Sequence, residues 1–295
     1  MSTRPDILPP IFIKELRKLQ DEVASIDFEE IEKVLKDELK ENFHKEFSSI
    51  NPEPQAAASI AQTHQALLKD GTEVILKIQR PNIKDIVQSD LEILKNLANL
   101  AEDRGILTDF ISPTDIIEEF RESLFKELNF KREVANMKQF ESNFSDNPNI
   151  ITPDVYENLT KKKLIIIKKI KGIKLNNFNP NKHTQIDNNH LAKVGAKAFM
   201  KQVLIDGFFH ADPHPGNIFI VDEDKIAYID FGLMGQLTSE IQTQFSLLFF
   251  ALLRKNINII VDLIIEIGVV PEDINLRKFK IDIHEGACLD IKFNL

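Results

Sequence analysis

The sequence predicts an α+β fold in which short groups of strands alternate with longer helical segments. Two apolar runs on either side of Asp70-Gly71 have the pattern of a β-hairpin. Apolar residues recur every three or four positions over residues 83–101 and again over 114–141, which is typical of amphipathic helices. A second strand–turn–strand pattern follows the Pro- and Gly-rich stretch 210–218 and ends at Asp230.

Composition narrows the class of protein. A chain of 295 residues, 43% hydrophobic and 28% charged, is long enough for one large domain or two lobes of an ordinary soluble protein. Its formal net charge of −9 argues against a general nucleic-acid binder. The single Cys288 excludes a disulfide framework. Residues 1–6 lack the apolar run of a secretory signal, and no stretch reaches about 18 apolar residues. We therefore expect a location in the cytoplasm or at the inner face of a membrane, an organelle membrane included.

The first third of the chain is expected to be mainly helical outside the hairpin. Residues 11–47 carry apolar positions at helical spacing and predict an N-terminal helical extension, and the Pro-rich stretch 51–54 predicts a linker after it. The helix over 83–101 carries one apolar stripe, consisting of Ile83, Ile86, Val87, Leu91, Leu94, Leu97 and Leu100.

The middle and end of the chain add strands and then helices. Residues 155–156 and 164–167 are strand-like, and the second segment is surrounded by lysines. These are Lys161, Lys162, Lys163, Lys168, Lys169, Lys171 and Lys174. They are typical either of a surface that meets an anionic partner or of a solvated strand edge that resists aggregation. Beyond residue 237 the pattern is helical, with Leu247, Leu248, Ala251 and Leu252 expected in the core.

Three polar residues at fixed spacing predict a phosphotransfer site. Asp212 and Asn217 are five positions apart, and Asp230 opens an Asp-Phe-Gly sequence eighteen positions after Asp212. In kinase-like sites a loop aspartate faces the acceptor hydroxyl, while an asparagine and a second aspartate bind the metal ions. Mg²⁺ prefers such hard oxygen ligands, completed by substrate phosphates. Two other interpretations stay open for the same loop: metal ligation by His210, Asp212 and His214, or a Pro-Gly loop with a purely structural role.

Together with further motifs, these residues resemble the UbiB family, also called the AarF or ADCK kinases, which is linked to coenzyme Q biosynthesis. The matching segments are Ala56-Ala57-Ala58-Ser59, residues 76–81, residues 127–133, residues 208–217 and Asp230-Phe231-Gly232. The resemblance implies a two-lobed protein-kinase-like fold with a helical N-terminal extension and a helical insert in the N-lobe. The expected division is an extension over 1–50, an N-lobe over 51–175 and a C-lobe over 176–295.

The resemblance also implies roles for individual residues, with ATP and Mg²⁺ as cofactors. Lys77 would hold the nucleotide phosphates and pair with Glu133, and Ala56, Ala57, Ala58 and Ser59 would cover the nucleotide. Asp212 would be the catalytic aspartate, Asn217 and Asp230 the metal ligands, and Glu127 part of a regulatory Glu-x-Asp element.

Some positions depart from the family pattern. Asn129 stands where the family usually has Asp, and Lys168 where a hinge glutamate usually follows the apolar strand. The Lys-x-Gly-Gln motif that usually precedes the Ser-Thr-Arg-Pro-Asp segment is absent before Met1, and the C-lobe is short. We interpret the sequence as a fragment, a split gene product or a protein with a misplaced start.

The expected function is Mg²⁺-dependent ATP binding with ATPase or small-molecule phosphotransferase activity in ubiquinone or other isoprenoid-lipid metabolism. The expected partners are a nucleotide, an isoprenoid lipid or membrane surface, and lipid-biosynthesis proteins, with no nucleic acid. The alternative is a non-catalytic nucleotide-binding regulator, a pseudokinase or scaffold of a lipid-biosynthetic complex.

Overall fold

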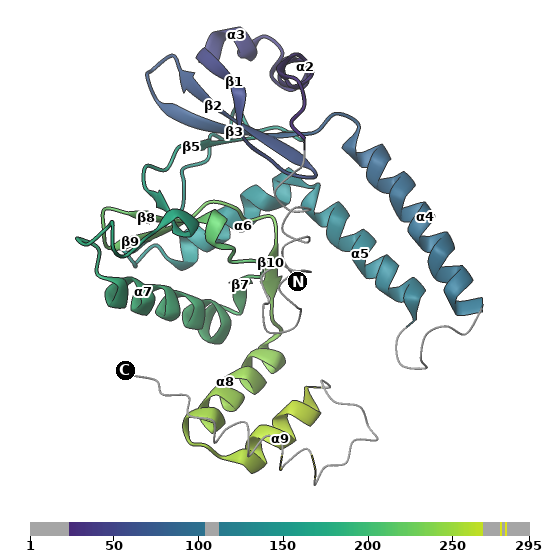
Figure 1. Cartoon of the computed structure of the whole chain (residues 1–295), viewed down its shortest axis with the longest axis vertical. Helices are drawn as coiled ribbons and strands as arrows, with labels where there is room; N and C mark the ends of the chain where they lie inside the picture. Colours follow the sequence, from purple (N-terminus) through teal and green to yellow (C-terminus); the bar gives the residue numbers. More distant parts are fainter. Residues whose placement is uncertain (1–23, 104–111, 268–277, 279–280, 282–295) are drawn as a thin grey trace. The chain divides into compact units, whose positions relative to one another are not determined.

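A computed structural model of the chain describes residues 24–103, 112–267, 278 and 281 (Figure 1). The described residues group into two compact units, each of which is described by itself. The first contains the chain up to residue 178 together with 214–222 and 227–233, and the second contains 179–213, 223–226 and the chain from residue 234. Helices and strands are mixed in the chain, which confirms the α+β prediction.

The first unit is built on a four-stranded sheet with the order β1-β2-β3-β5. Its strands are β1 (Phe47–Ala57), β2 (Ala61–Leu68), β3 (Glu73–Gln79) and β5 (Leu164–Lys168), and each neighbouring pair is antiparallel. Gly71 lies in the turn between β2 and β3 with a φ of 88°, a left-handed conformation that glycine adopts without steric cost. The predicted hairpin at Asp70-Gly71 is confirmed.

The predicted linker at residues 51–54 is wrong, because these residues lie within β1. β1 is the edge strand of the sheet, where a proline need not donate a hydrogen bond to a second neighbour. The pairing register with β2 also shifts between Ile50 and Pro54 and again between Pro54 and Ala56. These irregularities accommodate the two prolines without ending the strand.

Helices α2 (Phe28–Leu39) and α3 (Asn42–Glu46) cover one face of this sheet (Figure 1). Val74, Leu76 and Ile78 of β3 point to this face and are fully buried against Ile31 and Leu35 of α2. The helical prediction for residues 11–47 is thus confirmed over α2 and α3, whereas residues 11–23 lie outside the described part. Because side chains alternate along a strand, Ile75, Lys77 and Gln79 face the opposite side.

Three helices follow β3 and lead to the other face of the sheet. They are α4 (Ile83–Asp103), α5 (Pro113–Glu127) and α6 (Phe130–Asn143). The Ser112 hydroxyl accepts from the Asp115 N–H at the start of α5, and the Asn129 side chain accepts from the Arg132 N–H at the start of α6. Such caps satisfy first-turn amides that have no partner within the helix. They explain why the segment predicted over 114–141 is two helices.

The apolar stripe predicted on the first of these helices is only partly buried. Ile83, Val87 and Leu91 are buried, whereas Ile86, Leu94, Leu97 and Leu100 are exposed. The helical period was predicted correctly, but among the described elements α4 makes its main contacts with α5. Periodicity gives the side of a helix that is apolar, not how much of that side another element covers.

A second sheet in the order β4-β9-β8-β6 positions the polar motifs near residues 217 and 230. Its strands are β4 (Ile150–Ile151), β6 (Ile173–Lys174), β8 (Ile218–Val221) and β9 (Lys225–Tyr228). A 3₁₀ turn at Pro215–Asn217 leads directly into β8, and Asp230 lies two residues after β9.

The second unit contains α7 (Asn188–Met200), β7 (Phe208–His210), β10 (Met234–Gln236), α8 (Ser239–Leu253) and α9 (Ile257–Glu266). A π-helical turn at Lys201–Asp206 connects α7 to β7, which pairs with β10. The expectation of a buried Leu247 and Leu252 is wrong: both are 50% exposed, while Ala251 is buried. None of the described helices combines the length and the apolar character that crossing a membrane requires.

Candidate functional site

The predicted site residues of the first unit surround a pocket of about 210 Å³. It is bounded by the end of β1, by β2 and β3, by the segment 167–170 and by the two loops that carry residues 216–217 and 229–230. Of the residues predicted from sequence, Ala56, Ala58, Lys77, Asn217 and Asp230 line it.

Lys77 is held at this pocket by two carboxylates. Its Nζ donates to Glu133 Oε1 at 2.6 Å and to Asp230 Oδ1 at 3.4 Å. The ammonium also lies 5.6 Å from the centre of the Phe130 ring, a cation–π distance. The Lys77 side chain is 20% exposed and the Glu133 side chain 3%, so the contact predicted across 56 residues is present and largely shielded from water.

The pair has shifted pKa values with identifiable causes. Burial lowers the pKa of Lys77, but the negative charges of Glu133 and Asp230 raise it by more, so the net pKa lies above the usual lysine range. Burial raises the pKa of Glu133, and the nearby Asp230 adds to this, while Lys77 acts against it. Glu133 Oε2 is buried with no hydrogen-bond partner. Lys77 therefore remains protonated at neutral pH, and the Glu133 carboxylate compensates its shielded positive charge.

Asp230 is fixed by the backbone that follows it. Its Oδ1 accepts from the Gly232 N–H at 3.0 Å as well as from Lys77. A side chain at Gly232 would lie 3.3 Å from Asp230 Oδ1 and less than 4 Å from Glu127 and Glu133, so glycine allows these acidic groups to approach one another. Glu127, expected to be regulatory, thus lies beside the Asp-Phe-Gly turn.

Asn217 is fixed equally firmly in the loop that enters β8. Its N–H donates to the His214 carbonyl at 2.8 Å, and its carbonyl accepts from the Ile229 N–H at 3.1 Å. These bonds leave its side chain lining the pocket together with Asp230. Amide and carboxylate oxygens are ligands that suit Mg²⁺, with phosphate oxygens completing the shell. The residues present fit a nucleotide-associated Mg²⁺ ion.

The Ala-rich segment contributes two of its four predicted residues to the pocket. Ala56 and Ala58 line it, whereas Ala57 and Ser59 do not, because neighbouring residues of an extended chain point in opposite directions. Arg80 holds this segment in place: its Nε donates to the Ala58 carbonyl at 2.8 Å, and a terminal nitrogen donates to the Ala24 carbonyl at 2.8 Å.

Sequence reasoning missed most of the apolar lining of the pocket. Ile75, Ile167, Ile170, Phe219 and Ile229 surround its interior. Ile75 could have been found from its position two residues before Lys77 on the same face of one strand. The others come from segments whose proximity depends on the folded sheet. Lys168 also lines the pocket, and its Nζ pairs with Asp154 at 3.1 Å.

Asp212 belongs to the second unit, where its N–H donates to His210 Nδ1 at 3.2 Å. In the first unit His214 Nδ1 accepts from the Gly216 N–H at 3.0 Å. Both imidazoles thus bind the backbone of their own loops. Among the residues that the structure describes, no group of three or more His, Cys, Asp or Glu side chains could hold a metal ion. The alternative of a site made by His210, Asp212 and His214 has no support in the described residues.

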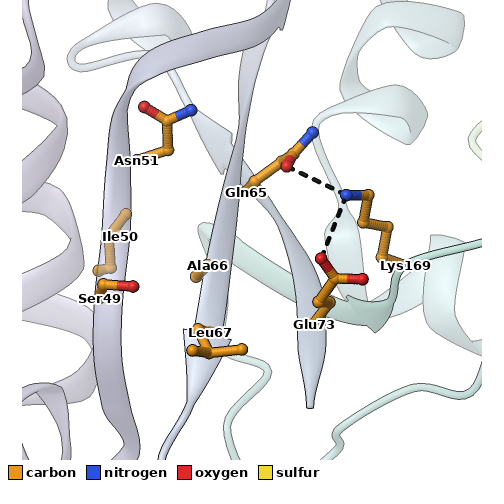
Figure 2. Close-up of a pocket in the computed structure, with 8 residues that line it drawn as sticks. All are labelled: Ser49, Ile50, Asn51, Gln65, Ala66, Leu67, Glu73 and Lys169. Atoms are coloured by element: carbon orange, nitrogen blue, oxygen red, sulfur yellow. Dashed lines mark hydrogen bonds and ion pairs between the residues drawn. The ribbon is translucent and has the colours of Figure 1, made fainter. Parts of the chain in front are cut away.

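A neighbouring pocket of about 290 Å³ is shown in Figure 2. Lys169 reaches across it, with Nζ 3.2 Å from Gln65 Oε1 and 3.6 Å from Glu73. Lys171 pairs with the other oxygen of Glu73 at 3.0 Å. Lysines of both pockets are paired with carboxylates, so pairing does not distinguish the pockets. The pocket at Lys77 is the better candidate for a nucleotide because Asn217 and Asp230, the predicted metal ligands, line it.

Comparison with known proteins identifies a family whose sequence pattern this chain matches. The ABC1 atypical kinase-like domain matches residues 18–264. An uncharacterized protein from the hydrogenase 1 5′ region of Clostridium pasteurianum is 38% identical over 276 residues, 93% of this chain and 52% of that protein. A probable protein kinase UbiB of Cellvibrio japonicus is 34% identical over 284 residues, 95% of this chain and 51% of its own length. The chain thus spans about half the length of the curated relatives it matches.

A solved structure shares the fold at lower sequence similarity. It is the complex of Rv3197 with erythromycin from Mycobacterium tuberculosis, which aligns with a TM-score of 0.67 and 22% identity. The alignment covers 97% of this chain and 72% of that chain. This likeness supports the kinase-like fold.

Proposed function

Because the chain belongs to the ABC1 atypical kinase-like family, we propose that it binds ATP with Mg²⁺ in the pocket at Lys77 and transfers the terminal phosphoryl group to water or a small molecule. The observation that carries this proposal is the triad of Lys77, Glu133 and Asp230, of which Lys77 and Asp230 line a largely apolar pocket. A protonated lysine held by a buried carboxylate is suited to bind phosphate oxygens without moving.

Different residues of the pocket would contact different parts of the bound Mg²⁺–ATP. The apolar side chains that line the pocket, among them Ile75 and Ile229, would contact the base of the nucleotide. Ala56 and Ala58 would cover the nucleotide closely because their side chains are small. Asn217 and Asp230 would hold Mg²⁺, which neutralises phosphate charge when bound. Asp212 would orient the hydroxyl or water that accepts the phosphoryl group and take up its proton.

For the acceptor we propose a small molecule of ubiquinone or other isoprenoid-lipid metabolism, with the membrane surface and lipid-biosynthesis proteins as partners. Support comes from the relatives named UbiB and from the family resemblance of the motifs.

The test measures binding and turnover in the same set of variants. Asp230→Asn should weaken Mg²⁺-dependent ATP binding about ten-fold, because a carboxylate that faces the metal is lost. Asp212→Asn should keep that affinity but lower ATP hydrolysis roughly 10²-fold, as expected for loss of a general base. Thermal-shift titration with and without Mg²⁺ gives the first value, and phosphate release gives the second.

The controls separate an enzyme from a regulator. Asp206→Asn is a matched loss of an aspartate outside the proposed site and should leave nucleotide affinity unchanged, although its pairing with Lys201 requires a folding check. If wild type binds Mg²⁺–ATP tightly but shows no turnover with vesicles or an isoprenoid phenol present, the activity is excluded and the non-catalytic regulator remains. If Asp230→Asn binds ATP as wild type does, the metal assignment is wrong.

A further inference from the structure

A third pocket of the first unit, of about 540 Å³, is lined by five cationic side chains. They are Arg80, Lys84, Lys131, Lys162 and Lys163, and Asp85 is the one carboxylate among the lining residues. We call it the cationic pocket. It includes two of the lysines that the sequence left undecided between an anionic partner and a solvated strand edge.

The fold collects these cations from separate parts of the chain. Arg80 follows β3, Lys84 lies in the first turn of α4, Lys131 lies in the first turn of α6, and Lys162 and Lys163 precede β5. A run of lysines in sequence has a solvated surface as its ordinary explanation. The exposed lysines of this pocket, in contrast, come from separate segments that the fold brings to one concavity.

The backbone adds positive potential at the same place. The first turns of α4, with 21 residues, and of α6, with 14 residues, both border the pocket. The first-turn amides of Asp85 and Arg132 already donate to Asn82 and Asn129. The contribution of the two helix ends is therefore the partial positive charge of the helix dipole. Asn129, which caps α6, also lines the pocket and is a neutral amide where the resembled family usually has an aspartate.

Some lysines of this unit pair with a carboxylate in the described part of the chain, whereas the pocket lysines, like the exposed Lys33 and Lys95, do not. Lys36, Lys126 and Lys138 each pair with a glutamate. Within residues 24–103 and 112–267, none of the four pocket lysines forms an ion pair. Glu38 Oε2 accepts a hydrogen bond from the backbone N–H of Lys163 at 3.3 Å.

We propose that the cationic pocket binds a phosphate or pyrophosphate group, carried by a soluble metabolite or by a lipid headgroup. Multiply charged, tetrahedral oxyanions accept hydrogen bonds from several lysines at once, which single carboxylates do less well. Arg80 contributes mainly charge, since its guanidinium already donates to two carbonyls, and the lysines contribute the free donors. The proposal does not depend on nucleotide binding at Lys77.

The experiment titrates the protein with pyrophosphate by calorimetry at low ionic strength. Lys162→Gln with Lys163→Gln should weaken binding about ten-fold or more, because two charge-assisted hydrogen bonds are lost. Asn129→Asp should weaken it several-fold, since aspartate caps a helix as well as asparagine does but places a negative charge at the pocket. Lys77→Met should leave this binding in place, which distinguishes the cationic pocket from the proposed nucleotide site.

The matched control is Lys193→Gln with Lys197→Gln, which removes two exposed lysines from α7 in the other unit. Binding should change less than about two-fold in this variant, apart from the general screening of charge. Equal weakening by both double variants would overturn the proposal in favour of non-specific attraction. Loss of pyrophosphate binding in Lys77→Met alone would also overturn it, as would the absence of binding to wild type.

A second arm identifies the source of the anion. Phosphatidylcholine vesicles with and without an anionic phospholipid are sedimented with wild type and with both double variants. Anion-dependent sedimentation that is lost only with Lys162→Gln and Lys163→Gln supports a lipid headgroup. Pyrophosphate binding without sedimentation supports a soluble phosphate compound.

Discussion

The pocket at Lys77 and the cationic pocket use positive charge in opposite ways, although both are built around β3. In the first, one lysine is shielded from water and is held by Glu133 and Asp230. In the second, four lysines form no ion pair in the described part of the chain, although Asp85 also lines the pocket. Removing one partner of the shielded pair leaves an uncompensated charge and should destabilise the fold, whereas removing an exposed, unpaired lysine should change stability little.

The largest expected effect comes from breaking the buried pair. Glu133→Ala leaves Lys77 with Asp230 as its partner and should lower the free energy of unfolding by roughly 3 kcal/mol. Urea unfolding measures this loss. The double variant Lys77→Met, Glu133→Leu should recover much of it, because an apolar pair avoids the cost of an uncompensated charge. A double variant as unstable as Glu133→Ala would show that the charge is not the cause.

A smaller effect is expected from pH. The pKa of Lys77 is raised in the folded protein, so above the ordinary lysine value of 10.5 the folded state holds a proton that the unfolded state has lost. The stability from this group is complete below that pH and is lost as the pH rises, at up to about 1.4 kcal/mol per pH unit. Urea unfolding of wild type from about pH 9.5 to about pH 11.5 should show this decline. Lys77→Met should show a shallower one, while Lys33→Met, at an exposed position, should follow wild type.

The smallest effect is expected at the exposed pair of Lys168 and Asp154. Both side chains are more than half exposed, so water competes with their contact at 3.1 Å. Lys168→Ala should shift the unfolding midpoint by at most about a tenth of the shift seen for Glu133→Ala. A comparable shift in the two variants would remove the distinction between shielded and solvated ion pairs on which this comparison rests.

Local patterns predicted the elements and the spacing of polar motifs well. The turn at Gly71 and the helix at 83–101 follow from local pattern, and the structure has them. The contact of Lys77 with Glu133 was implied by the family resemblance and is present as well. The strand through residues 51–54 was not predictable, because prolines indicate a break unless the edge position of the strand is known. The exposure of Leu97 and Leu252 also depends on which neighbours pack on each helix, a property of the whole fold.

The site was predicted in part for the same reason. The charged and amide residues of the site belong to recognisable sequence motifs. The apolar residues that line the pocket belong to none. Phe219 and Ile229 could not be distinguished in sequence from core residues of β8 and β9. The cationic pocket was visible only as a lysine-rich stretch, since Arg80, Lys84 and Lys131 join it through folding.

The prolines of β1 affect whether the sheets of two protein molecules can pair through this edge strand. An uncovered edge strand offers a row of amides and carbonyls on which another chain can form a continuous sheet. Pro52 and Pro54 remove two donors from that row, and the register shifts around Pro54 disturb the spacing of the rest. Strand-by-strand stacking of folded molecules through this edge is therefore disfavoured near Pro52 and Pro54.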